Sequence, residues 1–213
     1  LVSKLREDLG RDDLGLAHRL DRETSGVVVL GLGRDSINRL MRQFAGHRVR
    51  KEYLAVVTGS PDFERKTISL PLARDPDFPV PCRMRPDGAG AEAVTEIEVM
   101  WKDERRALIL ARPLTGRQHQ IRVHLAAIGH PIVGDKLYRL DGSAYLDMMN
   151  DRLTEDTIER LGHFRQALHA HTVRLHHPSS GRPIVLAAPV PDDMLSLLPA
   201  RAWDGVTGGR AIS

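Results

Sequence analysis

The residues that could do chemistry fall into three short groups along the chain. The first is the polar run HRLDRETSG at residues 18–26, in which Asp21 stands between Arg19 and Arg22 directly before an apolar stretch. A carboxylate that is fixed by a rigid element can act as a nucleophile or help to expel a leaving group. An Asp in a polar run is more often a turn or capping residue. Asp21 is therefore a candidate catalytic carboxylate, and the alternative is that it is a turn or capping residue with a purely structural role.

The other two groups supply a phenol and several cations. Tyr53 lies in KEYLAVVT at residues 51–58, and RPLTGRQHQIRVHL at residues 112–125 carries Arg117 and Arg122. A guanidinium beside a carboxylate favours the ionised form and fixes the geometry of the pair. Taken singly, Tyr53 fits a core tyrosine and the arginines fit the solvent face of an amphipathic helix. Arg122 lies beside the apolar stripe of that helix, so we expect it to be partly buried.

The ten histidines raise the question of a metal site. His169 and His171 would share one face of a strand, a spacing that metal sites use. The sequence has no acidic pair near them and no HExxH helix, so structural or surface histidines are preferred and no metal is predicted. The lone Cys82 excludes an internal disulfide and a thiolate metal cage. The segment GLGRDS lacks the lysine of a phosphate-binding loop.

Composition is that of a globular protein with one core. The chain has 213 residues, of which 41% are hydrophobic and 28% charged. No apolar run could span a bilayer, and the N-terminus lacks a signal-peptide core, so we expect a cytoplasmic protein with no membrane partner. The net charge is +3 and the sequence pI about 9.3, which is compatible with a nucleic-acid partner. Residues 141–160 are acidic, which indicates one acidic and one basic face.

Hydrophobic periodicity predicts the elements that must hold these groups. Residues 26–32 are typical of a buried strand, and a helix with Asp35 as its N-cap and Gly46 at its end should follow. Thr154 and Gly162 should bound a short helix. The remaining helix is predicted at residues 117–128, and the remaining strands at residues 51–58, 93–101, 106–113, 168–176 and 182–188.

These elements predict an α+β fold. Strands that follow one another directly, with few helices between them, favour a mainly antiparallel mixed sheet with flanking helices, and they exclude a regular βαβ domain. Residues 71–90 are rich in Pro, Gly and Arg, which predicts a long exposed loop or an irregular hairpin.

Together the three groups resemble the RluA-type family of RNA pseudouridine synthases. HRLDRETSGVVVLG resembles the catalytic loop of that family and the strand after it, RQFAGHRVRKEYLAVVTG its second segment, TGRQHQIRVHLAAIGHPIVGDKLY its third, and LHAHTVRLHHPSSGRPI its closing strands. The resemblance covers most of residues 16–191, in order and at the expected spacing. It implies the pseudouridine synthase catalytic fold as a single domain over residues 1–213.

The resemblance also implies roles for individual residues. Asp21 matches the catalytic aspartate, Arg122 the arginine paired with it, and Tyr53 the tyrosine that packs on the target base and is implicated in proton removal. Contacts to the substrate are expected from Arg19, which would take the place of the flipped uridine, and from Arg117, His119 and Gln120. The family isomerises uridine to pseudouridine in structured RNA without a cofactor or metal. We therefore expect an isomerase that modifies ribosomal large-subunit RNA or tRNA, as a monomer.

The reaction explains why these residue types are needed. The N1–C1′ bond breaks, the uracil turns and a C5–C1′ bond forms, so no atom is gained or lost and the redox state does not change. The uridine must leave the helix, at a cost of a few kcal/mol. Basic segments would neutralise phosphates, so RNA affinity should fall with salt.

Two departures from the family pattern and two other functions remain. An upstream segment with a Lys-Pro-Gly-like turn is absent, so we expect an N-terminally truncated catalytic domain. The segment at residues 139–166 is longer than in the shortest relatives and should form an acidic helical insertion. Residues 71–90 should contact RNA.

A catalytically silent RNA-binding or RNA-folding protein is the alternative function. A glycoside hydrolase would need a second acid across the bond from Asp21, and the sequence offers no convincing one.

Overall fold

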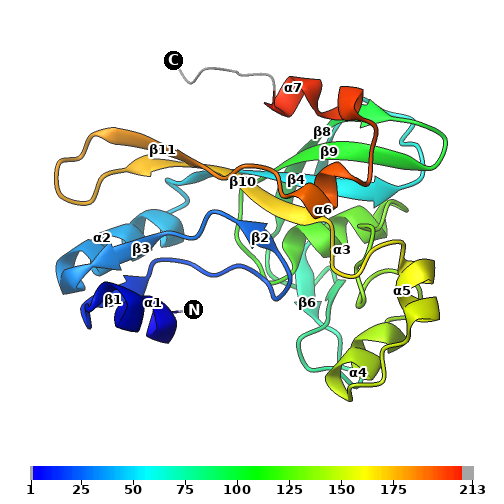
Figure 1. The fold of residues 1–213 in the computed structure, drawn as a ribbon, viewed down its shortest axis with the longest axis horizontal. Helices are drawn as coiled ribbons and strands as arrows, with labels where there is room; N and C mark the ends of the chain where they lie inside the picture. Colours follow the sequence, from blue (N-terminus) through cyan, green and yellow to red (C-terminus); the bar gives the residue numbers. More distant parts are fainter. Residues whose placement is uncertain (1, 208–213) are drawn as a thin grey trace.

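The computed structural model describes residues 2–207, and within them the centre of the molecule is a sheet of seven strands (Figure 1). Six strands run antiparallel to their neighbours and one short strand, β2, pairs with β10 in parallel. This confirms the mainly antiparallel mixed sheet. In spatial order the six are β11 (Pro183–Ala187), β10 (Leu168–His176), β4 (Arg50–Thr58), β9 (Arg106–Pro113), β8 (Val94–Lys102) and β5 (Arg65–Ser69).

Two small antiparallel ribbons flank this sheet. One pairs β1 (Leu14–Leu16) with β3 (Leu30–Leu32), and the other pairs β6 (Leu72–Arg74) with β7 (Met84–Pro86). The second ribbon confirms an irregular hairpin within residues 71–90. The helices are α1 (Val2–Leu9), α2 (Gly33–Ala45), α3 (Gln120–Ala127), α4 (Ser143–Met149), α5 (Glu155–Leu161), α6 (Asp192–Leu195), the 3-10 helix η1 (Ala200–Trp203) and α7 (Asp204–Thr207).

The main core surrounds β4 and β9. Residues 54–57 of β4 are each at most 1% exposed, so both faces of this strand are covered. Ile121 and Leu125 of α3 join this core, as do Met194 and Trp203 near the C-terminus. In Figure 1 the helices α6 and α7 lie above α3, with strands of the sheet between α3 and α7. The start of α3 is thereby fixed against the middle of the sheet.

A second core fixes α2 against the end of β10. Leu40 of α2 packs with Val49, Val173 and Leu175, all at most 5% exposed. Figure 1 shows β2 between α2 and the helices α3 to α5. The segment that contains Asp21 therefore runs between two packed cores.

The single strand predicted at residues 26–32 is wrong. The run is divided into β2 (Ser25–Gly26) and β3, which belong to different sheets. Gly26 has a φ of +115°, and a Cβ at this position would lie 2.2 Å from the Ala170 carbonyl oxygen. Only glycine allows both this conformation and this close approach. The chain therefore leaves β10 at Gly26 and continues toward β1.

The predicted helix boundaries are partly confirmed. Asp35 is not the N-cap of α2, because the helix begins at Gly33 and Asp35 lies in its first turn, while Gly46 ends the helix as expected. The helix predicted from Arg117 begins at Gln120, because His119 is left-handed with a φ of +55°.

The insertion at residues 139–166 is helical, as predicted. It contains α4 and α5. The Thr154 hydroxyl accepts a hydrogen bond from the Thr157 amide and Gly162 ends α5 with a φ of +77°, so both predicted caps are present.

Candidate active site

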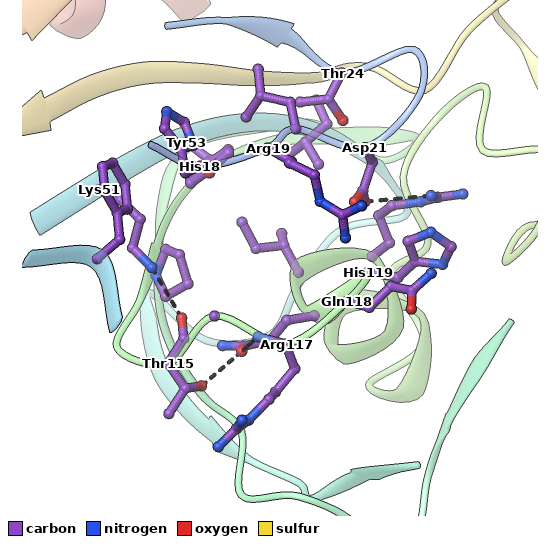
Figure 2. Close-up of a pocket in the computed structure, with 18 of the residues that line it drawn as sticks. His18, Arg19, Asp21, Thr24, Lys51, Tyr53, Thr115, Arg117, Gln118 and His119 are labelled. Carbon is purple, nitrogen blue, oxygen red and sulfur yellow. Dashed lines mark hydrogen bonds and ion pairs between the residues drawn. The ribbon is translucent and has the colours of Figure 1, made fainter. Parts of the chain in front are cut away.

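A cleft of about 620 Å³ lies where the loop before β2, the strand β4 and the start of α3 meet (Figure 2). A volume of this size falls in the range of small-molecule sites and would accept one flipped nucleotide. All seven residues that the sequence predicted for the site line this cleft: Arg19, Asp21, Tyr53, Arg117, His119, Gln120 and Arg122. Asp21 and Arg122, which are 101 residues apart in the sequence, thus meet in one place.

Arg122, which lines the cleft, contacts two carboxylates. Its Nε and Nη2 donate to the two carboxylate oxygens of Asp135 at 2.7 and 2.9 Å, and its Nη1 lies 3.5 Å from Asp21 Oδ2. The pairing of Arg122 with Asp21 is therefore present, but the shorter, bidentate contact is with Asp135. The guanidinium also lies over the Tyr138 ring, 5.0 Å from its centroid.

The ion pair between Arg122 and Asp135 outweighs burial in deciding the charge state of both groups. Burial alone would lower the pKa of Arg122, and the charge and hydrogen bonds of Asp135 outweigh it and raise that pKa above its ordinary value. Burial would likewise raise the pKa of Asp135, whereas Arg122 and two backbone amides lower it. Both groups are therefore ionised at neutral pH. One guanidinium faces two carboxylates, so Asp21 shares its counter-ion with a fully buried partner.

Tyr53 is neutral at physiological pH. Burial and then the negative charge of Asp21 raise the pKa of its phenol to about 12. The residue lies on β4 and lines the same cleft as Asp21. In the free protein its ring is thus an uncharged surface on which a base could stack.

The loop at residues 18–26, which the sequence predicts to be catalytic and which is called the catalytic loop from here on, is fixed at both ends. The Val29 amide donates to His18 Nε2 at 3.0 Å, and the His18 ring stacks on Phe44 with ring centroids 4.4 Å apart. At the other end Ser25 Oγ and His169 Nδ1 are 2.9 Å apart. The Thr24 amide donates to the Asp21 carbonyl at 3.0 Å, which closes a turn over Arg22 and Glu23. Asp21 therefore projects from a tight turn rather than from a free loop.

His119 is an uncharged polar group of the cleft. Burial and then the charge of Arg122 lower its pKa to about 4. Its Nδ1 shares a hydrogen bond of 2.8 Å with the Tyr138 hydroxyl, which also accepts from the Met84 amide. Figure 2 shows His119 and Gln118 beside Asp21, with Lys51 and Thr115 at the opposite side of the cleft. The remaining ring nitrogen, Nε2, is the atom of His119 that a ligand could use.

Gln120 has its hydrogen bonds within the protein. Its side-chain oxygen accepts from the Thr115 hydroxyl and the Arg117 amide, and its nitrogen donates to the Val94 carbonyl and Thr95 Oγ1 at 2.9 Å. The side chain is buried. This geometry supports a role in holding the turn before α3, and the predicted contact of Gln120 with substrate stays a prediction.

Three of the cations that border the cleft, Arg19, Lys51 and Arg117, have no carboxylate partner among the described residues. Lys51 Nζ donates to the Thr115 carbonyl at 3.1 Å and Arg117 Nε to the Glu92 carbonyl at 2.8 Å, while Arg19 extends from the catalytic loop. Within residues 2–207 none of the three forms a salt bridge. Cations without a counter-ion around a cleft of this size attract a polyanion.

Sequence reasoning missed two residues that the geometry makes central. Asp135 is 0% exposed and holds Arg122, and Tyr138 contacts both Arg122 and His119. Asp135 follows Arg122 by 13 residues in the same resembling segment. The available signal was physical: a buried arginine needs a buried acid, and a search for the partner of Arg122 other than Asp21 leads to Asp135.

The structure gives two further findings on the described part of the chain. Residues 2–207 contain no group of three or more His, Cys, Asp or Glu side chains that could hold a metal ion. None of the helices described is both long and apolar enough to cross a membrane.

A family model described as RNA pseudouridylate synthase matches residues 1–127. The match covers more than half of the chain and includes Asp21, Tyr53 and Arg122. This chain belongs to the RNA pseudouridylate synthase family. The family expected from the sequence is thereby confirmed.

Relatives in this family carry names that refer to two kinds of RNA. The chain is 39% identical over 190 residues to ribosomal large subunit pseudouridine synthase D of Xanthomonas campestris. The aligned region covers 89% of this chain and 55% of that protein. It is 33% identical over 211 residues to tRNA pseudouridine synthase C of Salmonella typhi. That alignment covers 92% of this chain and 77% of that protein. The chain spans about half the length of the ribosomal relatives that it matches.

Solved structures share the fold. Human RNA Pseudouridylate Synthase Domain Containing 1 is 29% identical with a TM-score of 0.70, covering 91% of this chain and 75% of that one. Human RNA Pseudouridylate Synthase Domain Containing 4 is 25% identical with a TM-score of 0.69, covering 92% and 80%. The pseudouridine synthase catalytic fold is thereby confirmed.

Proposed function

We propose that this chain isomerises uridine to pseudouridine in structured RNA, with Asp21 as the essential carboxylate. The observation that carries the proposal is the shared guanidinium of Arg122, which holds Asp21 at the edge of a cleft of nucleotide size. Asp21 keeps 26% of its side chain exposed, whereas Asp135 has none. Of the two acids that contact Arg122, Asp21 is therefore the one that a substrate could reach.

The reaction divides between the residues of the cleft. A uridine flipped from its helix would place its base against Tyr53, and Arg19 would fill the gap that the base leaves. Asp21 then attacks the nucleoside covalently or assists the departure of N1 from C1′. The uracil turns, C5 bonds to C1′ and any bond to Asp21 is released. C5 then loses its proton and N1, which left C1′ with its electron pair, gains one. The product is an isomer of the substrate, so the reaction balances without a cofactor.

Tyr53 is the candidate for the last step because it lines the cleft beside Asp21, where its ring would lie against the target base. Burial and then the charge of Asp21 raise the pKa of its phenol to about 12, so the hydroxyl keeps its proton in the free protein. A neutral phenol can take the proton of C5 only if it passes on its own, so Tyr53 would act as a proton relay and not as a strong base.

RNA binding is assigned mainly to the cations around the cleft. Arg19, Lys51 and Arg117 have no carboxylate partner among the described residues, whereas Arg83 and Arg85 of the hairpin at residues 71–90 pair with neighbouring aspartates. Names of relatives refer to both ribosomal RNA and tRNA, so these two are the candidate substrates. The hairpin would select between them through shape more than through free charge.

Asp21→Asn tests the proposal. The amide is isosteric but is neither a nucleophile nor an anion, so pseudouridine formation should fall by about 10³-fold or more. The matched control is Asp13→Asn, because Asp13 is exposed and pairs only with Arg11 at the far end of the ribbon β1–β3. Pseudouridine sites are mapped in ribosomal RNA and tRNA incubated with each protein.

Three outcomes would contradict the proposal. Full activity of a clean Asp21→Asn sample would exclude Asp21 as the essential group. Binding of RNA by the unmodified protein without any pseudouridine would favour the catalytically silent RNA-binding protein. Release of free uracil or sugar would indicate hydrolysis of the glycosidic bond instead of isomerisation.

A further inference from the structure

The turn after α3 places two consecutive charged side chains in the interior. Asp135 and Lys136 are 0% and 2% exposed. Asp135 accepts two hydrogen bonds from Arg122 and also accepts from the amides of Leu137 and Tyr138, which fixes its carboxylate. This turn therefore determines where Arg122 lies.

Lys136 reaches the catalytic loop from the same turn. Its Nζ lies 2.8 and 3.0 Å from the two carboxylate oxygens of Glu23, and it also donates to the Phe164 carbonyl. Ammonium ions are rarely buried without a partner, since the cost of desolvation is high. The position of Glu23 is therefore tied to that of Lys136.

Glu23 belongs to the turn that carries Asp21. It has a φ of +71°, a left-handed conformation that a residue other than glycine holds only when its surroundings require it. The Arg165 guanidinium donates to the Glu23 carbonyl at 3.3 Å and is itself held by Asp193 at 2.6 and 2.9 Å. Gln166 Nε2 donates to Thr24 Oγ1 at 2.5 Å.

The end of the insertion at residues 139–166 thereby contacts the catalytic loop. Phe164, Arg165 and Gln166 all take part in these contacts, and Figure 1 shows the segment between α5 and β10 passing beside the loop that leads to β2. The helices α4 and α5 join the turn at Lys136 to this segment. Lys136, which lies just before the insertion, and Arg165 and Gln166 at its end thus all contact the loop.

We propose that Lys136 is a positioning residue that orients Asp21 through Glu23. The dipeptide Asp135–Lys136 would then fix the position of Arg122 relative to Asp21, because Asp135 contacts Arg122 and Lys136 contacts the loop of Asp21. The role rests on the proposed function. Asp135 places the guanidinium and Lys136 places the loop with the carboxylate, so a shift of one relative to the other changes the 3.5 Å contact between Arg122 and Asp21. Reactive groups lose about 100-fold in rate when they are displaced by about 1 Å.

The test compares Glu23→Gln, Lys136→Met and the double variant. Each single substitution removes one charge of the pair; glutamine keeps the length of Glu23, and methionine is one atom shorter than Lys136. With an RNA substrate, kcat should fall by about 10-fold to 100-fold while KM stays within about twofold, because the loop is misplaced but the cations of the cleft are intact. The double variant should be no slower than the slower single one, since both remove the same contact. Lys136→Arg should recover most of the rate, and Lys4→Met, which removes an exposed lysine, is the control.

A second measurement needs no RNA and no activity. The Thr24 amide donates to the Asp21 carbonyl, so its hydrogen exchange reports how firmly the turn is closed. Exchange at Thr24 should become at least about tenfold faster in Glu23→Gln and stay unchanged in Lys4→Met. If the wild-type chain had no synthase activity but the Thr24 amide still exchanged faster in Glu23→Gln, the proposed function would be contradicted. The contact between Lys136 and Glu23 would still be shown to position the turn.

Two results would overturn the inference. The Glu23 side chain is partly exposed, so the Glu23→Gln variant should fold even if the Lys136→Met variant does not. If Glu23→Gln had the kcat and the Thr24 exchange rate of the wild type, the positioning role would be excluded. A rise of KM alone, with kcat unchanged, would show that the pair serves RNA binding and not the placement of Asp21.

Discussion

At the scale of single residues, Arg122 is divided unequally between two acids. Its bidentate contact with Asp135 is short and buried, and its contact with Asp21 is single and 3.5 Å long. A fully paired Asp21 would be held firmly and would be a weak nucleophile. An unpaired Asp21 would be free to turn away. In the proposed reaction, the loose contact would let Arg122 orient the carboxylate while leaving one oxygen for the substrate.

Arg122→Lys should show that the fork of the guanidinium matters beyond its charge. A lysine cannot contact Asp135 with two donors and reach Asp21 with a third, so the free energy of unfolding should fall by about 2 to 4 kcal/mol and kcat by roughly 100-fold. Arg112→Lys is a matched control, because Arg112 also joins two acids, Glu52 and Glu98, but is 34% exposed. Urea unfolding and single-turnover rates measure both effects.

The control should lose less than about 1 kcal/mol and keep its rate, since an exposed ion pair contributes little. Equal losses in the two variants would mean that burial of Arg122 is not what makes it sensitive.

The residues of the site divide into those that sequence could supply and those that it could not. Asp21, Tyr53 and Arg122 carry chemistry in their residue types, and their segments resemble one family, so they could be named in advance. Asp135 and Lys136 act on the site only through Arg122 and Glu23, and nothing in the sequence shows that Lys136 reaches Glu23, 113 residues away. Gln120 was predicted at the substrate because it lies in the motif, whereas its amide is occupied by four contacts within the protein.

At the scale of elements, the site depends on turns more than on helices and strands. The strands β9 and β10 begin and end where alternation predicts them. The run at residues 26–32 was misread because a continuous apolar stretch has no internal mark of the point where it changes sheets. That mark is Gly26, whose need for glycine becomes clear only when Ala170 lies against it.

Gly134→Ala tests whether the turn that carries Asp135 and Lys136 is as tightly packed as its geometry indicates. A Cβ at Gly134 would lie 1.9 Å from the Arg165 carbonyl oxygen, with a φ of +78°. The backbone of the turn and that of residue 165 must separate, so the free energy of unfolding should fall by about 3 kcal/mol or more, as measured by urea unfolding.

Gly129→Ala separates conformational strain from the clash. Gly129 has a φ of +86° and nothing within 4 Å of a Cβ, so this variant should lose only about 1 to 2 kcal/mol. If both variants lost the same amount, the close approach of the turn to Arg165 would contribute nothing to stability.

At the scale of the whole molecule, the same burial that builds the site makes the fold sensitive to acid. Five histidines have pKa values that burial lowers: His18, His119, His124, His163 and His169. They belong to the catalytic loop, to α3 and to the segments that hold the loop. Their neutral forms accept or share the hydrogen bonds that connect these parts, so protonation acts on the site and on the fold together.

The free energy of unfolding should therefore fall as the pH drops from about 6.5 toward 4. A histidine whose pKa is lowered by folding binds its proton more readily in the unfolded chain, so its contribution is complete above pH 6.5 and is lost as the pH falls through the folded value. For His119, whose folded pKa is about 4, this contribution is on the order of 3 kcal/mol. His119→Gln should give a flatter profile of Tm against pH over this window, and His176→Gln, an exposed residue on β10, should leave the profile unchanged. A His119→Gln profile with the wild-type slope would mean that His119 takes up its proton at no cost to the fold, and that the contact of its ring with Tyr138 and Arg122 does not exclude the charged form.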